Sequence, residues 1–158
     1  MKFKNIFLSI AVLCFLMAGC EQVPEPEPVE EPVEVDDGVR EPQNGGFLLM
    51  LGDEAGYLEI VVNGVAGKLT AYVLDAKAKD PASLSQSTID LELVRRVLMG
   101  KGVEVITDNL SLSSENSDNS SFSVQDDKLK DIDSFQGSLG TISLDGQDFN
   151  NLSFSFPQ

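Results

Sequence analysis

The sequence contains no histidine in its 158 residues, and this absence excludes most catalysis near neutral pH. Histidine is the usual general base at that pH and the commonest metal ligand in proteins. Its absence removes Ser-His-Asp and Cys-His chemistry, together with most zinc and copper sites. Neither a Gly-x-Ser-x-Gly elbow nor a Ser-x-x-Lys motif is present. We therefore predict that the protein is not an enzyme and carries no cofactor.

Cysteine and basic residues are also scarce. The two cysteines, Cys14 and Cys20, both lie in the first twenty residues, so the rest of the chain cannot contain a disulfide framework. Eleven Lys and Arg stand against 26 Asp and Glu, which gives a net charge of −15. A chain of this charge repels nucleic acid and anionic lipid headgroups. We therefore expect no nucleic-acid partner.

The first 19 residues have the three parts of a secretory signal peptide. Lys2 and Lys4 come first, an apolar run from Ile6 to Met17 follows, and the small pair Ala18-Gly19 closes the stretch. The run is too short for a transmembrane helix, which needs about 20 apolar residues. We predict that residues 1–19 are a signal peptide.

The end of this stretch, Met17-Ala18-Gly19-Cys20, resembles the lipobox of bacterial lipoproteins, although leucine is commoner than methionine at the first position. The resemblance implies cleavage between Gly19 and Cys20 and a diacylglyceryl group on the Cys20 sulfur. It also implies an acyl chain such as palmitate on the new amino group. Two or three acyl chains hold a protein at a membrane. Cys20 is thus the predicted lipidation site, and the membrane is the partner it reaches.

The signal has a second interpretation, which is a secreted protein cleaved near Ala18 with Cys20 as a free thiol. The lipoprotein interpretation places the chain in the bacterial cell envelope, with its domain facing the periplasm or the cell surface. Glu21 follows the cysteine. Because aspartate at this position retains some lipoproteins in the inner membrane, Glu21 favours the outer membrane.

Residues 20–46 contain the lipidated cysteine and an acidic, proline-rich segment. Five of the seven prolines and nine carboxylates lie here, beside the single Arg40. Proline prevents helix formation and removes sheet donors, and like charges extend the chain. We predict a disordered linker that reaches roughly 60 to 80 Å and ends at Gly45-Gly46. A docking peptide is the alternative, but the Pro-Glu repeat offers no side chain that would specify a partner.

Residues 47–158 have the pattern of a small all-β domain. Short runs alternate apolar and polar residues, which places one face on a core and the other in water. In one run Leu58 and Ile60 share the apolar face while Glu59 faces water; in the clearest run Ile89, Leu91 and Leu93 alternate with Thr88, Asp90 and Glu92. Turn residues such as Asn63-Gly64 and Asp145-Gly146 separate the runs. About eight strands predict an antiparallel β-sandwich of the Ig-like type or a partly closed barrel.

Two stretches break this alternation. In residues 126–135, Leu129, Ile132 and Phe135 are three apart behind Asp126, which predicts a short helical segment capped by that carboxylate. Residues 94–102, VRRVLMGKG, predict an irregular crossing or a short helix that ends at Gly100.

We expect Phe122, Phe149, Phe154 and Phe156 to lie in the core. A ligand groove lined by the last two is the alternative.

Residues 44–81 carry a second resemblance. Gly45-Gly46, Leu51-Gly52-Asp53, the run from Glu59 to Val62 and the run from Gly67 to Asp75 resemble a small exported β-sandwich module of unknown function. That module is related to one found with periplasmic adaptor subunits of metal-efflux pumps. Asn44 stands where the module has histidine, so the resemblance implies the fold and not a metal site.

Carboxylates are the only other candidates for chemistry. Asp126, Asp127, Asp131 and Asp133 are weak candidates for a metal site, because no Asp-x-Asp-x-Asp-Gly loop accompanies them. We predict a membrane-anchored lipoprotein that serves as a non-catalytic structural or interaction module, with an envelope protein as its partner. The alternative is an accessory protein of an efflux or metal-handling system that binds cations weakly through carboxylates.

Overall fold

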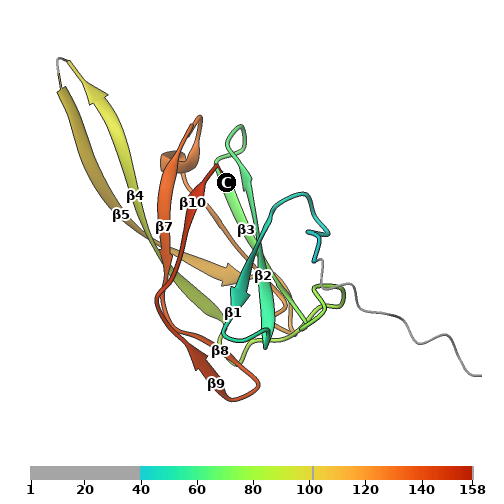
Figure 1. Cartoon of the computed structure of the whole chain (residues 1–158). Coiled ribbons are helices and arrows are strands. Elements are labelled where there is room, and N and C mark those ends of the chain that lie inside the picture. Colours follow the sequence, from blue (N-terminus) through green and yellow to red (C-terminus); the bar gives the residue numbers. More distant parts are fainter. Residues whose placement is uncertain (1–39, 101, 158) are drawn as a thin grey trace, which may run out of the picture. The chain divides into compact units, whose positions relative to one another are not determined.

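A computed structural model describes residues 40–157 except Lys101. The predicted signal peptide, Cys20 and most of the predicted linker therefore lie outside the described residues. The described part contains ten strands and one 3-10 helix, η1 (Figure 1). Their bounds are β1 Phe47–Leu51, β2 Gly56–Asn63, β3 Lys68–Leu74, β4 Thr88–Met99, β5 Gly102–Ser114, β6 Ser121–Gln125, η1 Asp127–Leu129, β7 Phe135–Leu139, β8 Ile142–Leu144, β9 Gln147–Phe149 and β10 Leu152–Phe156.

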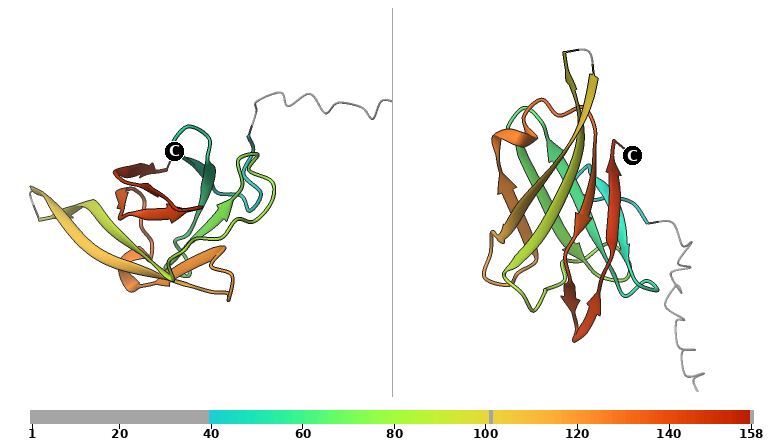
Figure 2. Two further views of the ribbon diagram at one scale, coloured as in Figure 1. Left: turned by 90° about the horizontal axis from the view of Figure 1, so that it is seen from below. Right: turned by 90° about the vertical axis from the view of Figure 1, so that its left-hand side faces the viewer.

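Eight strands form one antiparallel sheet in the order β1-β2-β3-β6-β5-β4-β7-β10, and β8 and β9 form a separate hairpin. The large sheet curls so strongly that its two edges approach each other (Figure 2). At this closure the rings of Phe47 on β1 and Phe154 on β10 have centroids 5.4 Å apart. The predicted all-β, antiparallel class is confirmed. The Ig-like sandwich is not confirmed, because a single hydrogen-bonded sheet wraps nearly into a barrel instead of two sheets packing face to face.

The core follows the alternation in the sequence. On β4, Ile89, Leu91 and Leu93 are buried, whereas the intervening Thr88, Asp90 and Glu92 are exposed. Three of the four expected core phenylalanines, Phe122, Phe149 and Phe154, are buried. Phe156 is half-buried at the rim of the core, 5.5 Å from Phe135 between ring centroids. The alternating phenylalanines of β10 therefore pack against other strands.

The predicted helical segment is present as η1, with the predicted cap. Asp126 accepts a hydrogen bond from the backbone N–H of Lys128 at 2.9 Å, and Leu129 is fully buried. Phe135 does not belong to this segment but begins β7. β6 pairs with β5 only at Ser113 and Ser114 and continues beside β3 to Gln125, and η1 begins two residues later. Within the described residues, no helix is long and apolar enough to cross a membrane.

The prediction for residues 94–102 is wrong. They form neither a crossing nor a helix but the distal half of a long β4–β5 hairpin, in which Met99 pairs with Gly102. Gly100, at φ +61°, adopts the left-handed conformation that such a tight turn requires. Residues Gly102–Ser114 form a single strand, β5.

Glu59 is also placed differently from the expectation. It lies on the face of β2 opposite Leu58 and Ile60, yet it is fully buried, because residues 43–46 cross over it. Its carboxylate accepts hydrogen bonds from the backbone N–H groups of Gln43, Asn44 and Gly46, at 2.6–3.0 Å, and from the Asn44 side chain at 2.9 Å. The folded part therefore includes the last residues of the predicted linker.

Candidate interaction surface

The distal half of the β4–β5 hairpin, residues 95–106, projects from the curled sheet, and we call it the hairpin arm. β7 accompanies β4 only from Leu91 to Val94, and β6 leaves β5 after two residue pairs. Beyond these points the two strands pair only with each other. In Figures 1 and 2 the arm extends away from the curled sheet.

The two faces of the arm differ in composition. Side chains of directly paired residues share a face, so the alternation that buries Leu91 and Leu93 assigns every residue of the arm to a face. The outer face, which continues the solvent side of β4, carries Arg96, Leu98, Val103 and Val105. The inner face, which continues the core side, carries Arg95, Val97, Met99, Glu104 and Ile106.

Apolar side chains on the arm are unusually accessible. Leu98 is 82% exposed, Met99 58%, Val103 62% and Val105 61%. Among the described residues only two other large apolar side chains, Met50 and Val65, are exposed. Isolated exposed apolar residues are normal on proteins, but four gathered on one projecting element, three on its outer face and Met99 on its inner face, are of the kind that marks an interaction site.

The base of the arm is fixed by a carboxylate between two cations. Asp108 on β5 lies 2.9 Å from Arg95 Nε and 3.3 Å from Lys128 Nζ, so it connects both strands of the hairpin to η1. Burial raises the pKa of Asp108, but the hydrogen bonds and charges of Arg95 and Lys128 outweigh it and hold that pKa below its usual value. The ion pairs thereby link the base of the arm to η1.

Charge on the arm is opposite in sign to that of the whole chain. Residues 95–106 contain Arg95, Arg96 and Lys101 against one carboxylate, Glu104, within a chain of net charge −15. Glu104 lies on the inner face. The outer face of the arm therefore has apolar side chains and Arg96 but no carboxylate.

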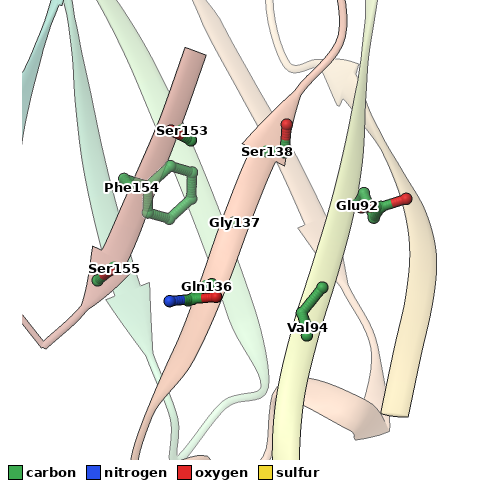
Figure 3. Close-up of a pocket in the computed structure, with 8 residues that line it drawn as sticks. All are labelled: Glu92, Val94, Gln136, Gly137, Ser138, Ser153, Phe154 and Ser155. Carbon is green, nitrogen blue, oxygen red and sulfur yellow. The ribbon is translucent and has the colours of Figure 1, made fainter. Parts of the chain in front are cut away.

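A shallow furrow runs along the outer face from the base of the arm. Its middle part, shown in Figure 3, has a volume of about 360 Å³ and is lined by Glu92, Val94, Gln136, Gly137, Ser138, Ser153, Phe154 and Ser155. A further hollow continues it towards Asp90 and Asn109, and another towards Arg96 and Phe156. Short hydroxyl and amide side chains line the furrow from β7 and β10. Such a surface can bind a polar ligand.

The residues predicted as sites are not brought together. Gly19 and Cys20 lie outside the described residues. Asp126 caps η1, and Asp127 pairs with Lys130 at 2.6 Å, while Asp131 and Asp133 are exposed. Across residues 40–100 and 102–157, no three Cys, Asp or Glu side chains converge as they would around a metal ion.

Sequence reasoning missed the hairpin arm. A signal was available: Val97, Leu98 and Met99 follow one another without alternation, and no proline or polar cluster ends the strand before Gly100. Loss of alternation in a segment that remains extended indicates a hairpin that has left its core.

No family model, no curated protein and no solved structure matches the chain. The resemblances to the lipobox and to the exported β-sandwich module therefore remain predictions from the residues that carry them.

Proposed function

We propose that the protein is a lipoprotein of the bacterial cell envelope, anchored through Cys20, and that it acts as a non-catalytic binding module whose contact element is the hairpin arm. The observation that carries the second part is the exposure of Leu98, Met99, Val103 and Val105 on one projecting element. An arm that only completed the fold would bury these side chains.

The anchor is supported by the order of features at the amino terminus. A basic start, a short apolar run and Met17-Ala18-Gly19-Cys20 follow one another in the order expected of a lipoprotein signal. Anchoring would keep the acidic body near a membrane surface that its net charge would otherwise disfavour. The alternative role in metal handling gains no support from the positions of Asp126 and Asp127, which are engaged as a cap and in an ion pair.

Intact mass and detergent partitioning of the protein from its native host test the anchor. We expect a mass increase corresponding to acyl chains and recovery in the detergent phase. A Cys20→Ala variant should lack both. A wild-type protein with a bare thiol in the aqueous phase would contradict the lipoprotein assignment.

A photocrosslinking residue at position 98 tests the contact element in intact cells. We expect an adduct, to a protein or to lipid, from position 98 and none from position 65, because Val65 is 91% exposed but lies on the loop between β2 and β3. Equal labelling at the two positions, or none at 98, would show that the arm makes no specific contact.

A further inference from the structure

We propose that the hairpin arm binds the surface of an anionic lipid membrane, with its outer face against the headgroups and its apolar end in the interface. This proposal rests on the arm being the contact element and names the partner that the arm meets. The argument depends on where charge and apolar side chains lie along the arm.

The outer face of the arm carries the chemistry that an anionic bilayer surface recognises. Arg96 lies on this face with Leu98, Val103 and Val105, while Glu104, the one carboxylate of the arm, lies on the other. Lys101 adds a cation between Gly100 and Gly102 in the sequence. Cations beside exposed aliphatic side chains attach proteins to anionic interfaces, each Lys or Arg strengthening binding by about fivefold.

The arm also separates its cations from the acidic remainder of the chain. The chain as a whole repels anionic headgroups, and Asp90 and Glu92 are exposed on β4 before the arm begins. Figure 1 shows the arm directed away from the curled sheet. A projecting element can therefore reach a membrane while the acidic body remains at a distance, where salt screens the repulsion.

The distribution of apolar side chains over both faces favours lipid over a protein groove. Leu98 and Val103 lie on the outer face, but Met99 lies on the inner face and is 58% exposed. A groove in a protein covers one face of a strand, and it would leave Met99 in water. A fluid interface surrounds the end of the hairpin and covers both faces.

A single tryptophan can report on the arm, because the chain contains none. The predicted mature chain, residues 20–158, would carry Cys20→Ala so that acyl chains cannot contribute, with Leu98→Trp in one variant and Val65→Trp in a matched control. Each is mixed with vesicles of phosphatidylcholine alone or of phosphatidylcholine with phosphatidylglycerol. We expect a blue shift of emission only for Leu98→Trp, and only with the anionic vesicles.

Two kinds of variant test separately the contribution of the cation and that of the apolar side chains to vesicle binding. In the Leu98→Trp background, Arg96→Glu should weaken vesicle binding by at least about tenfold, and Lys79→Glu, a reversal on the loop after β3, should leave it unchanged. Val103→Ser with Val105→Ser should also weaken it by roughly tenfold. Unchanged thermal midpoints and circular dichroism spectra would establish that these variants fold.

Three results would overturn the proposal. The first is no shift with anionic vesicles, and the second is an equal shift with both kinds, which would remove headgroup charge from recognition. The third is a shift without vesicles that grows with protein concentration, which would show that a second copy covers the arm. In that case the arm would remain a contact element, and the assignment of its partner to lipid would fail. If Cys20 proves not to be acylated in cells, that result would contradict the proposed anchor and not the proposed binding of the arm to lipid.

Discussion

At the scale of single residues, the ring of Phe154 determines which residue type fits at the paired position on β7. Gly137 pairs with Phe154 in the sheet, and a Cβ atom added to Gly137 would lie 2.4 Å from the ring's Cζ atom. The aromatic ring covers the strand at the glycine, an arrangement that compensates for the missing side chain. Figure 3 shows the ring of Phe154 beside the strand that carries Gly137.

We predict that Gly137→Ala lowers the free energy of unfolding by about 1–3 kcal/mol, because the ring must move out of its packed position. Urea denaturation measures the change. Gly102→Ala on β5 is the control, since no atom lies within 4 Å of its added Cβ, and it should change stability by less than about 0.5 kcal/mol. Phe154→Leu in the Gly137→Ala background should recover part of the loss. Equal effects of the two glycine substitutions would refute this explanation.

Glu59 shows where residue-level prediction reaches its limit. Alternation in β2 correctly separated Leu58 and Ile60 from Glu59, and it predicted water on the glutamate's side. The structure instead covers that side with residues 43–46, whose N–H groups converge on the carboxylate. Periodicity reports the face on which a side chain lies but not whether a distant segment covers that face.

At the scale of elements, the hairpin arm depends on Asp108 at its base. The Asp108 side chain is 12% exposed and that of Arg95 24%, whereas in the pair of Asp127 and Lys130 the side chains are 88% and 51% exposed. Exposed ion pairs contribute little to stability because solvent and salt screen them, and partly buried pairs are screened less.

We predict that Asp108→Asn costs about 1–2 kcal/mol of stability, since Arg95 and Lys128 lose a charged partner and only a neutral acceptor remains. Amide exchange in residues 102–107 should become several-fold faster in this variant, as measured by hydrogen–deuterium exchange with mass spectrometry. Asp127→Asn provides the comparison and should leave exchange in the arm unchanged. An unaltered exchange rate in the Asp108 variant would mean that strand pairing alone fixes the arm.

Prediction of elements succeeded where a core imposes a pattern and failed where none does. Ile89, Leu91 and Leu93 face the core, and β4 was recognised there from its alternation. Beyond Val94 the same strand leaves the core, and its apolar residues occupy both faces. Neither face is then selected by burial, so the sequence loses the two-residue period that identifies a strand.

At the scale of the whole molecule, acid is expected to destabilise the fold. Burial raises the pKa values of Glu59, Asp75 and Asp108. Hydrogen bonds to all three carboxylates, and nearby cations for the two aspartates, lower these pKa values by more than burial raises them. Each pKa therefore lies below its usual value. A carboxylate with a lowered pKa in the folded state stabilises that state above its unfolded pKa of about 4. This contribution is lost as the pH falls through the folded-state pKa.

We predict that the thermal midpoint is nearly constant from pH 8 to pH 5.5, because the chain has no histidine, and falls by roughly 5–10 °C between pH 5 and pH 3. Circular dichroism melting curves measure it. Glu59→Gln should make the acid decline shallower, whereas Glu92→Gln, at an exposed position on β4, should not. A midpoint that rises on acidification to pH 3 would show that relief of the net negative charge dominates.

The order of strands in the sheet also determines when the sheet can close if the chain is delivered with its amino terminus first. β1, β2 and β3 can pair as soon as they appear, but β3 must wait for β6, and β4 for β7, before the sheet is continuous. Phe47 on the first strand gains its aromatic neighbour only with Phe154 on the last. A partly delivered chain therefore has an open seam with apolar strands on both sides of it.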